Sequence, residues 1–513
     1  MNTVLYRGGT VRAEGAAPAT AMLVDGSVIA WVGRDDVAPA ADTVVDLAGA
    51  LVTPAFVDAH VHCTATGLAL DGLDLSTAGT LAEALRLLET QVRKDRGAAV
   101  LGHGWDETRW PEGRPPTRQE VDRASYGGVV YLSRIDSHSA VVSSALLAAV
   151  PGARGLPGFD ESGWLRQAAH HAVRRVARET LSAGQRAVAQ RTTRRRAAEL
   201  GIGCLHEMGG PDISGAEDLR ALLTLASEEP GPEIIAYWGA LGGIDAARGL
   251  GAVGAAGDLF VDGSIGSHTA SVHRPYVDKD TCGERYLERA ATAKHIVACL
   301  ESGLQAGFHA IGDAAIGFLV NECYADAALA MGERWPSRTR HRMEHAEMVD
   351  DQLIARMAEL GIVASVQPAF DAAWGGRSGM YARRLGVERA LTMNPLAAMQ
   401  AAGVVLALGS DSPVTPLDPW GTVRAAVHHR TPGAGITAEQ AFAAHTTGGW
   451  RAAGRTGEGA LAPGAPATFA VWAGDAIAAG ATLPALEPHG EPPACLRTVV
   501  RGVPIHDLEG ALG

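Results

Sequence analysis

The stretch 55–62, AFVDAHVH, is an apolar run that ends in two histidines one residue apart. Side chains alternate between the two faces of a β-strand, so His60 and His62 are expected on the same face. Two imidazoles side by side form half of a metal site, although two structural histidines with satisfied hydrogen bonds would give the same pattern. The rest of the chain therefore has to decide between these interpretations.

Three later strand-like segments also end in metal-binding side chains: QAGFHAIGD at His309, HRMEHAEM at His345 and VVLALGSDSPV at Asp411. Between the two ends of the chain, strands alternate with Ala- and Leu-rich helical stretches, which predicts a TIM-type (β/α)8 barrel. The predicted strands begin near Phe56, Gly203, Ile234, Asp258, Gly307, Met343, Val363 and Val405. Active sites of such barrels lie at the carboxyl ends of the strands, where these histidines and the aspartate fall.

The two ends of the chain predict a separate β-domain. Short β-rich pieces with Gly and Asp turns occupy the first fifty residues, and the pattern returns in GALAPGAPATFAVW and LRTVVRGVPIHD near the C-terminus. We expect residues 1–54 and 455–513 to pair into one β-sandwich, because sheet edges need to be covered. The barrel then spans residues 55–454.

About 140 residues separate the first two predicted strands, which is too long for a loop and predicts an inserted subdomain over residues 64–200. Trp105, Asp106 and Trp110 stand close together there, in a chain with only 5% aromatic residues. They form either a local turn cluster or a cap that lines the pocket and selects the substrate; we expect the cap. His138 is the best further polar candidate for substrate binding.

The composition narrows the function. The chain has 513 residues, 47% hydrophobic and 20% charged, with a net charge of −13, which argues against nucleic-acid binding. No signal peptide or membrane-spanning run is evident, and the six scattered cysteines suggest reduced thiols, so we expect a cytoplasmic protein that acts on a small molecule. The sequence is compatible with a homo-oligomer.

The ordered motifs resemble the amidohydrolase superfamily, and most of all the amidohydrolase family 3 branch that includes N-substituted formamide deformylases. The resemblance runs from residue 1 to about 475. It rests on these stretches: LVTPAFVDAHVH, GWDETRWPEGRPPTR, SRIDSHSAVVSSALL, LFVDGSIGSHTA, FHAIGDAAI, RHRMEHAEMV, GIVASVQPAF, LALGSDSPVTPLDP and GALAPGAPATFAVW. It implies an α/β protein with a composite β-sandwich, a distorted (β/α)8 barrel and a bound divalent metal, which hydrolyses an amide or related C–N bond.

The resemblance also implies roles for individual residues. The implied metal ligands are His60, His62, His309, His345 and Asp411. Asp411 would be the base that takes a proton from the attacking water and passes it to the leaving nitrogen, and His345 would be a ligand or would polarise the water or the substrate. Asp313 and Glu344 are candidates for orienting the imidazoles.

One position departs from the family. Many relatives carry a carboxylated lysine on the fourth strand that bridges two metals, whereas this chain has Asp258. Because aspartate is several bonds shorter, we expect one metal held by His60, His62, His309 and Asp411 rather than a bridged pair. Glu207 or His206 on the second strand, or Asp258 itself, could supply a further ligand.

Zinc is the expected metal for a site rich in histidine, and iron, manganese and cobalt also suit this ligand set. The predicted activity is hydrolysis of a non-peptide amide, formamide or related C–N bond. A one-metal deaminase or a cyclic amide hydrolase would share the same core and is the alternative. A non-catalytic binding barrel is disfavoured, because every expected core residue except the lysine is present.

Overall fold

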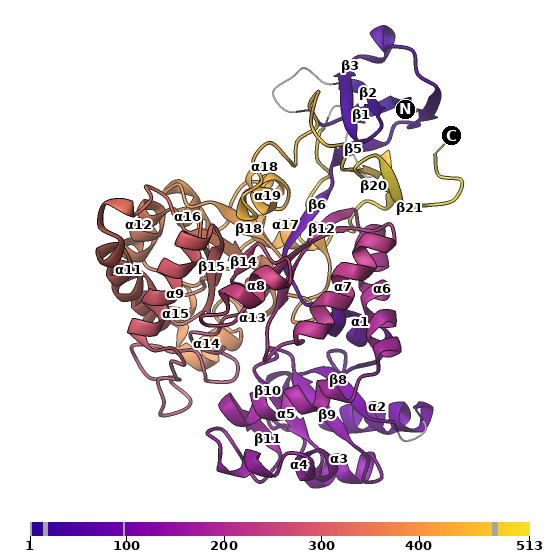
Figure 1. Cartoon of the computed structure of the whole chain (residues 1–513). Helices are drawn as coiled ribbons and strands as arrows, with labels where there is room; N and C mark the ends of the chain where they lie inside the picture. Colours follow the sequence, from indigo (N-terminus) through magenta and orange to yellow (C-terminus); the bar gives the residue numbers. More distant parts are fainter. Residues whose placement is uncertain (1–2, 14–18, 96–97, 475–480, 513) are drawn as a thin grey trace.

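Eight parallel strands form a nearly closed barrel at the centre of the molecule (Figure 1). They follow one another around the barrel in chain order, and a parallel bridge between Val61 and Ser412 joins the last strand to the first. The strands are β6 (Phe56–Val61), β12 (Ile202–Gly209), β13 (Glu233–Trp238), β14 (Gly254–Ala255), β15 (Gln305–Ala310), β16 (Arg342–His345), β17 (Val363–Val366) and β18 (Leu406–Leu408). The computed structural model describes residues 3–13, 19–95, 98–474 and 481–512. The predicted TIM-type barrel is confirmed.

One strand differs from its predicted position. The sequence predicts that the fourth strand begins at Asp258, but β14 ends at Ala255 and Asp258 lies in the irregular segment that follows. This segment rejoins the barrel through a bridge between Phe260 and His309. The fourth strand is thus very short, and the chain after it does not continue as a regular strand.

Amphipathic helices cover the outside of the barrel. In α12 (Asp351–Leu360) the side chains of Leu353, Ile354, Met357 and Leu360 recur at helical spacing and are buried. The preceding Asp350 accepts a hydrogen bond from the Leu353 amide, and Gly361 ends the helix with a left-handed φ of 66°. The other helices around the barrel are α7 (Ala216–Glu228), α8 (Ile244–Gly249), α9 (Arg289–Ser302), α13 (Pro368–Trp374), α14 (Met380–Leu385), α15 (Val387–Ala390), α16 (Leu396–Ala401), α17 (Pro419–Val427), α18 (Ala438–Ala444) and α19 (Thr447–Ala452).

A continuous helical stretch, Asp313–Arg334, is the one part of the described chain that is long and apolar enough to span a membrane by length and composition. It consists of α10 (Asp313–Gly317), the π-helical turn η4 (Phe318–Cys323), α11 (Tyr324–Met331) and the short 3-10 turn η5 (Gly332–Arg334). Half of its apolar window is buried, and Ile316, Leu319 and Ala327 belong to the main core. It therefore packs as a core helix of the barrel.

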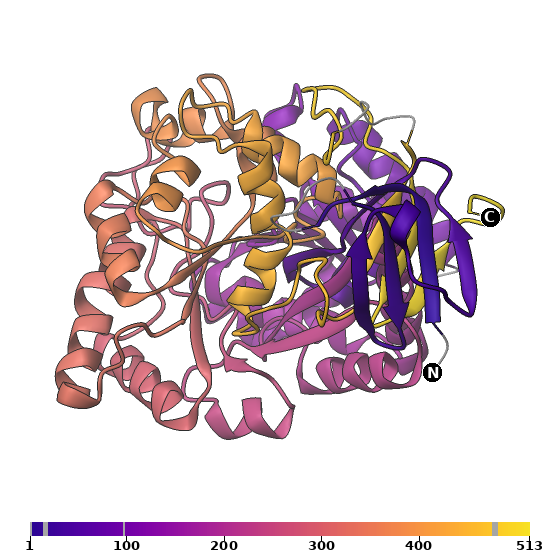
Figure 2. The same cartoon turned by 90° about the horizontal axis from the view of Figure 1, so that it is seen from above.

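The two ends of the chain form one eight-stranded sheet beside the barrel (Figures 1 and 2). Its strands are β1 (Thr3–Val11), β2 (Ala19–Asp25), β3 (Val28–Gly33), β4 (Thr43–Asp46), β5 (Leu51–Pro54), β19 (Phe469–Trp472), β20 (Cys495–Val500) and β21 (Val503–Asp507), with the 3-10 turn η1 (Asp35–Val37) after β3. The sheet is mixed rather than purely antiparallel, because β1 pairs in parallel with β4 and β5. A bridge between Val28 and Pro466 curves the sheet around its own hydrophobic core. Strands from both ends of the chain therefore build one β-sandwich, as predicted.

A second sheet lies within the predicted insertion, at the far side of the barrel from the terminal sheet (Figure 1). Its strands are β7 (Leu73–Asp74), β8 (Val100–Trp105), β9 (Val130–Arg134), β10 (Ser139–Val142) and β11 (Trp164–Arg166). The helices of this region are α1 (Cys63–Asp71), α2 (Leu81–Lys94), η2 (Glu107–Arg109), α3 (Arg118–Ala124), α4 (Ser144–Ala148), η3 (Pro151–Gly155), α5 (Gln167–Glu179) and α6 (Ala183–Glu199). Thr193 of α6 donates a hydrogen bond to the Cys63 carbonyl at the start of α1. This bond joins the first and last helices of the insertion.

Candidate metal centre

Four histidines and two aspartates meet at the carboxyl end of the barrel strands. His60 and His62 come from β6, His309 from β15 and His345 from β16. Asp258 follows β14 and Asp411 follows β18. The most exposed of the six side chains, that of His62, is only 13% exposed. Because burial of a polar group is unfavourable without a partner, each of these side chains requires one.

Each histidine is held by the ring nitrogen that faces away from the cluster. Nδ1 of His60 lies 2.9 Å from Oε2 of Glu344, and Nδ1 of His345 lies 2.8 Å from Oε1 of Gln367. Nδ1 of His62 and Nε2 of His309 each lie 3.2 Å from a backbone carbonyl, of Met208 and Gly263 respectively. These acceptors fix the tautomer in which the outer nitrogen carries the proton and the inner nitrogen presents a lone pair.

The inner atoms face one another without ordinary hydrogen bonds. Asp411 Oδ1 lies 3.2 Å from His62 Nε2 and 3.5 Å from His60 Nε2, and Asp258 Oδ1 lies 3.4 Å from His309 Nδ1 and 3.7 Å from His345 Nε2. The atoms that are buried without a hydrogen-bond partner include His60 Nε2, Asp258 Oδ1, His309 Nδ1, His345 Nε2 and Asp411 Oδ1. Two ligands on one tetrahedral zinc ion lie about 3.3–3.5 Å apart, given metal–ligand distances near 2.0–2.2 Å. The donor set therefore fits a divalent cation.

Asp258, one of the residues expected as a possible further ligand, stands at the centre of this arrangement. Its carboxylate lies within 3.2–3.7 Å of the inner nitrogens of all four histidines. The irregular chain after β14 brings Asp258 inward among the imidazoles, while the expectation of one metal rather than a bridged pair stays a prediction. Burial raises the pKa of Asp258, but the surrounding imidazoles outweigh this effect and hold it well below its usual range.

The residues that could hold a metal form three overlapping groups within the described chain. These groups are His60, His62 and Asp258; His60, His345 and Asp411; and Asp258, His309 and His345. Asp258 belongs to two of them. None of these groups contains His309 together with His60 or His62, whereas the one-metal expectation assigns all three histidines to the same ion.

Strained backbone positions aim two of these side chains. His345 has φ 72° and Asp411 has φ 52°, which is the left-handed region that residues with a Cβ rarely adopt. The Asp411 amide donates to the His60 carbonyl at 2.8 Å. Asp58 accepts hydrogen bonds from the amides of Ser410 and His60, so it fastens the end of β18 to β6. Burial raises the pKa of Asp58 to about 6.

Three of the further candidates for the centre lie outside it. The carboxylate of Glu207 accepts a hydrogen bond from the Cys63 amide at 2.7 Å. His206 accepts a hydrogen bond at Nδ1 from the guanidinium of Arg342 at 2.9 Å, on the inside of the barrel. Asp313 accepts from the amides of His273 and Ala314 and contacts no imidazole within the described chain. Neither Glu207 nor His206 belongs to the metal-binding groups, and Asp313 does not orient a ligand.

Glu344 does orient His60, and it is itself held by Arg342, for which the sequence analysis predicts no role. Arg342 donates from Nε to Glu344 Oε1 at 2.8 Å, and both side chains are fully buried. Burial raises the pKa of Glu344, but Arg342 and His60 outweigh it and keep the carboxylate ionised. The alternation in HRMEH, which places Arg342 and Glu344 on one face of a strand, is the signal that could have found this pair.

The expected aromatic cap is a structural core. Trp105 is fully buried and donates to the Leu132 carbonyl, and Trp110 is 5% exposed and donates to the Ala78 carbonyl. Asp106 accepts from Thr108 and pairs with Arg134. These three residues lie in the interior of the inserted sheet and line neither of the two cavities described below, so their role in substrate choice stays a prediction.

His138, by contrast, lies beside the centre. Its ring centroid is 4.8 Å from that of His309, and burial together with His309 lowers its pKa well below the usual value. It lines a cavity of about 30 Å³ together with His309, His345 and Asp411. The other walls of this cavity are mostly apolar and aromatic, from Phe370, Trp374, Met380 and Tyr381, with Glu347 as a polar group.

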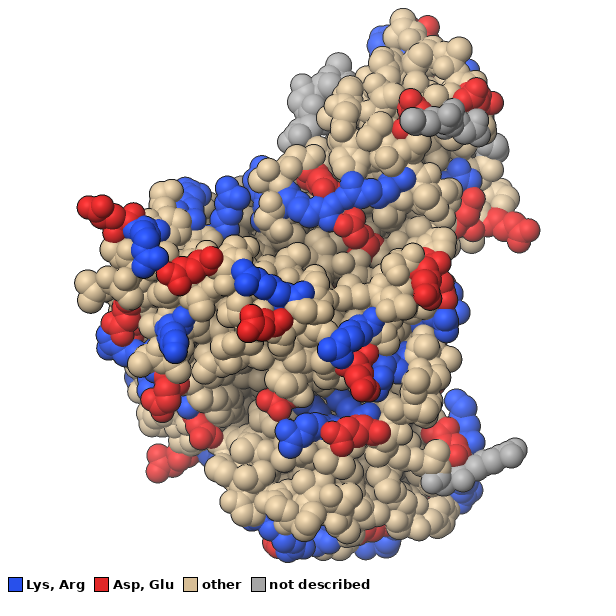
Figure 3. Space-filling view, in the orientation of Figure 1, with Lys and Arg blue, Asp and Glu red and all other residues tan. Residues whose placement is uncertain are grey.

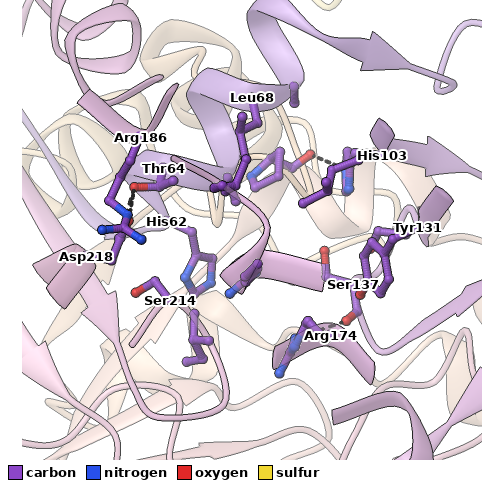
Figure 4. Close-up of a pocket in the computed structure, with 18 of the residues that line it drawn as sticks. His62, Thr64, Leu68, His103, Tyr131, Ser137, Arg174, Arg186, Ser214 and Asp218 are labelled. Carbon is purple, nitrogen blue, oxygen red and sulfur yellow. Dashed lines mark hydrogen bonds and ion pairs between the residues drawn. The ribbon is translucent and has the colours of Figure 1, made fainter. Parts of the chain in front are cut away.

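A second pocket, of about 70 Å³, is bordered by His62 (Figure 4). Its walls come from α1, α5 and α6, from the inserted sheet, and from the barrel. The candidate metal centre therefore borders two cavities that have no lining residue in common.

Comparison with known proteins agrees with the barrel fold. The model of the amidohydrolase family matches residues 43–506, which is most of the chain. The chain belongs to the amidohydrolase family. This makes it a hydrolase of carbon–nitrogen bonds that depends on a divalent metal, as predicted.

Its relatives are distant but align over most of their length. The amidohydrolase is 28% identical over 473 residues to Protein LONG AFTER FAR-RED 3 of Arabidopsis thaliana, covering 83% of this chain and 78% of that protein. It is 27% identical over 511 residues to N-substituted formamide deformylase of Arthrobacter pascens, covering 88% and 90%. An uncharacterized metal-dependent hydrolase from Pyrococcus horikoshii OT3 has a similar structure, with a TM-score of 0.74, 26% identity, and coverage of 92% and 97%.

Proposed function

We propose that this amidohydrolase cleaves a formamide or another non-peptide amide of a small molecule. The observation that carries the proposal is the convergence of buried, unpartnered donor atoms from His60, His309, His345, Asp258 and Asp411. The chain is 27% identical to an N-substituted formamide deformylase over nearly its whole length, which supports formamides as the first substrate class to test.

We propose that His60, His62, His309, His345, Asp258 and Asp411 hold the metal, with zinc first and iron, manganese or cobalt as substitutes. Asp258 belongs both to the group with His60 and His62 and to the group with His309 and His345. We therefore propose two cation positions that would both use the Asp258 carboxylate. Two cations close together need a shared anion to limit their repulsion. Such a centre would lower the pKa of a water ligand and polarise a carbonyl group.

The chain's own groups then account for proton movement and substrate position. Asp411 is the proposed base, because its carboxylate lies at the cluster and faces the cavity that also contains His138. It would take a proton from the attacking water and return it to the leaving nitrogen, which an amide requires because the amine anion is a poor leaving group. His138, with its lowered pKa, stays neutral and can hydrogen-bond the substrate.

The apolar cavity supports a substrate with an apolar or aromatic group. Phe370 stacks on His345 with ring centroids 5.9 Å apart, and Trp374 packs against Phe370 at 5.1 Å. A small apolar group of the substrate placed there would be shielded from water beside the reacting bond. A cytoplasmic location remains a prediction from the cysteines.

The test is metal analysis combined with a substrate screen on the same purified protein. The screen compares N-substituted formamides, N-acyl amino acids, cyclic amides and nucleobases, each with and without added zinc or manganese. Turnover of formamides or acyclic amides that depends on the metal supports the proposal. Turnover confined to nucleobases or cyclic amides would favour the deaminase or cyclic-amide alternative, and no turnover in fully metal-loaded protein would favour a binding barrel.

A further inference from the structure

The pocket beside His62 contains positive charge that the described residues do not neutralise (Figure 4). Helix α5 contributes Arg174 and Arg178, one helical turn apart, and α6 contributes Arg186. Arg186 pairs with Asp218 at 3.1 Å. Glu207, the other carboxylate of the pocket, accepts from the Cys63 amide, so both acidic groups are already engaged.

Arg174 is only 5% exposed, yet no carboxylate pairs with it among the described residues. Its guanidinium donates to the Ser137 carbonyl at 3.4 Å and to His171 Nδ1 at 3.1 Å, and its Nε has no hydrogen-bond partner in the described chain. A buried cation without an anion is costly unless a ligand supplies one. The side chain therefore offers an unneutralised charge to the pocket that it lines.

A single aromatic ring separates this guanidinium from the metal centre. The Arg174 guanidinium carbon lies 5.8 Å from the centroid of Phe260, and the Phe260 ring lies 5.0 Å from that of His309. His62 forms a wall of the same pocket. A small molecule could thus contact Arg174 and reach the reacting centre at the same time.

Arg178 adds a second positive charge. It is half-buried, lines the same pocket, and forms no ion pair within the part of the chain that the structure describes. Burial and the neighbouring Arg174 lower the pKa of Arg178 to about 10, which reflects both its loss of hydration and the repulsion between the two guanidinium groups. An anion between them would relieve this repulsion.

We propose that Arg174 and Arg178 bind a carboxylate of the substrate, so that the substrate is an N-formyl or N-acyl compound that carries an acid group. This inference rests on the proposed hydrolysis of an amide at the adjacent centre. Guanidinium groups match carboxylates with two parallel hydrogen bonds, and such charge-assisted bonds are stronger than neutral ones. The cavity beside His138 and His345 would take a small apolar part of the molecule.

Isothermal titration calorimetry with two probes that have no C–N bond tests the binding site directly. The probes are 3-phenylpropionate and 3-phenylpropan-1-ol, which differ in the acid group. We expect the parent protein to bind the acid at least about tenfold more tightly than the alcohol. Arg174→Gln and Arg178→Gln should each weaken acid binding by about tenfold and leave alcohol binding unchanged.

Matched variants distinguish binding at this site from a general effect of lost positive charge. Arg195→Gln, on the exposed face of α6, removes one positive charge outside the pocket and should leave both affinities unchanged. Arg174→Lys keeps the charge but not the two-pronged geometry, so we expect an intermediate loss. Metal content is measured in every preparation, because a carboxylate could also bind a cation directly.

The result that overturns the proposal is an acid affinity that does not change in Arg174→Gln and Arg178→Gln, or a parent that does not prefer the acid. A second readout compares kcat/KM for N-formylphenylalanine and N-formylphenethylamine, which lacks the carboxylate. If neither is cleaved, the proposed function fails while the calorimetric preference still decides the anion site. If both are cleaved equally and the calorimetry shows no preference, the anion site fails while the hydrolase proposal stands.

Discussion

Asp411 combines three properties that a proton-transferring base requires. Its Oδ1 faces His60 and His62, its backbone is held in a left-handed conformation with φ 52°, and its amide is fixed to the His60 carbonyl. These contacts fix the backbone that carries the carboxylate at the edge of the cluster. The residue is thus positioned before any substrate binds.

Replacing Asp411 by Asn should preserve the fold and remove most turnover. The amide keeps an oxygen in place but cannot accept a proton at neutral pH. General acid–base catalysis contributes about 10²–10⁴-fold, so kcat should fall by that amount or more. The measurement is kcat with metal content and circular dichroism as controls. Turnover at the parent rate in a metal-loaded variant would exclude Asp411 as the base.

Asp258 is the residue for which a change should alter metal content most. Its carboxylate faces all four histidines, so Asp258→Asn removes a negative charge shared by both groups. We expect about two metals per parent chain and at most one in the variant, measured by elemental analysis after dialysis with excess zinc. Asp245→Asn on the surface helix α8 is the matched control. One metal in the saturated parent would instead support the single-metal interpretation.

At the scale of elements, the inserted sheet depends on its tryptophans for stability. Trp105 packs against Trp110 and Trp164, with centroid distances of 6.5 and 5.9 Å, in the core between the sheet and α2. Its indole N–H has a buried partner, so truncation removes both packing and a hydrogen bond.

We expect Trp105→Ala to lower the free energy of unfolding by about 3–5 kcal/mol. Relative kcat/KM values among substrates should stay unchanged, because the side chain lines neither cavity beside the centre. Urea denaturation and the substrate screen are the measurements. Tyr126→Ala, at a 64% exposed position of the same insertion, is the control and should have a small effect. A change of specificity at full stability would restore the cap hypothesis.

A buried ionic cluster joins the insertion to the barrel. Arg134 of β9 pairs with Glu107 at 2.9 Å and with Asp136 at 2.7 Å. Asp136 in turn accepts hydrogen bonds from Ser264 and Ser267 of the barrel, both at 2.8 Å. The cluster therefore fixes the loop that carries His138 against the cavity wall.

Arg134→Met should leave buried carboxylates without their cation and destabilise the protein by about 3–5 kcal/mol. Because Arg384 also pairs with Glu107, the lower end of this range is expected. Urea denaturation measures the loss. Arg93→Met, which breaks an exposed pair with Glu89, should have a much smaller effect. Equal effects of the two variants would show that the cluster has no special structural role.

At the scale of the whole molecule, the residues of the candidate metal centre come from distant parts of the barrel. They come from β6, the segment after β14, β15, β16 and the segment after β18, so a bound cation cross-links segments from nearly the whole length of the barrel. The face of the molecule shown in Figure 3 mixes acidic and basic side chains without a large patch of one sign. Binding of metal to the folded state alone stabilises it by mass action.

Removal of metal with a strong chelator should lower the melting temperature by several degrees and abolish activity, and zinc or manganese should restore both. The physical reason is that the clustered donor atoms have no hydrogen-bond partner in the described chain and lose the cation that would engage them. Differential scanning calorimetry and the activity assay are the measurements. His62→Ala should respond much less to the chelator. Full activity in rigorously metal-free protein would contradict the metal-dependent mechanism.

The sequence by itself determined the barrel, the terminal sheet and the positions of the four histidines and Asp411. These features follow from local pattern: strand alternation places His60 and His62 on one face, and His309, His345 and Asp411 each stand at or just after the end of an apolar strand. Glu344 could also be assigned, because it precedes His345 on the same short strand and its face is fixed by the pleat.

Only the tertiary structure decided the surroundings of Asp258, Trp105 and Arg174. Asp258 reaches the centre because the chain leaves the strand path after β14, and no local pattern encodes how far an irregular segment moves inward. Trp105 and Trp110 are hidden because other strands and α2 cover them, which depends on packing between distant segments. Arg174 lacks an anion because the carboxylates that share its pocket, Glu207 and Asp218, are engaged by other groups. Burial and charge balance are sums over all neighbours, and the neighbours of a side chain are fixed only when the whole chain has folded.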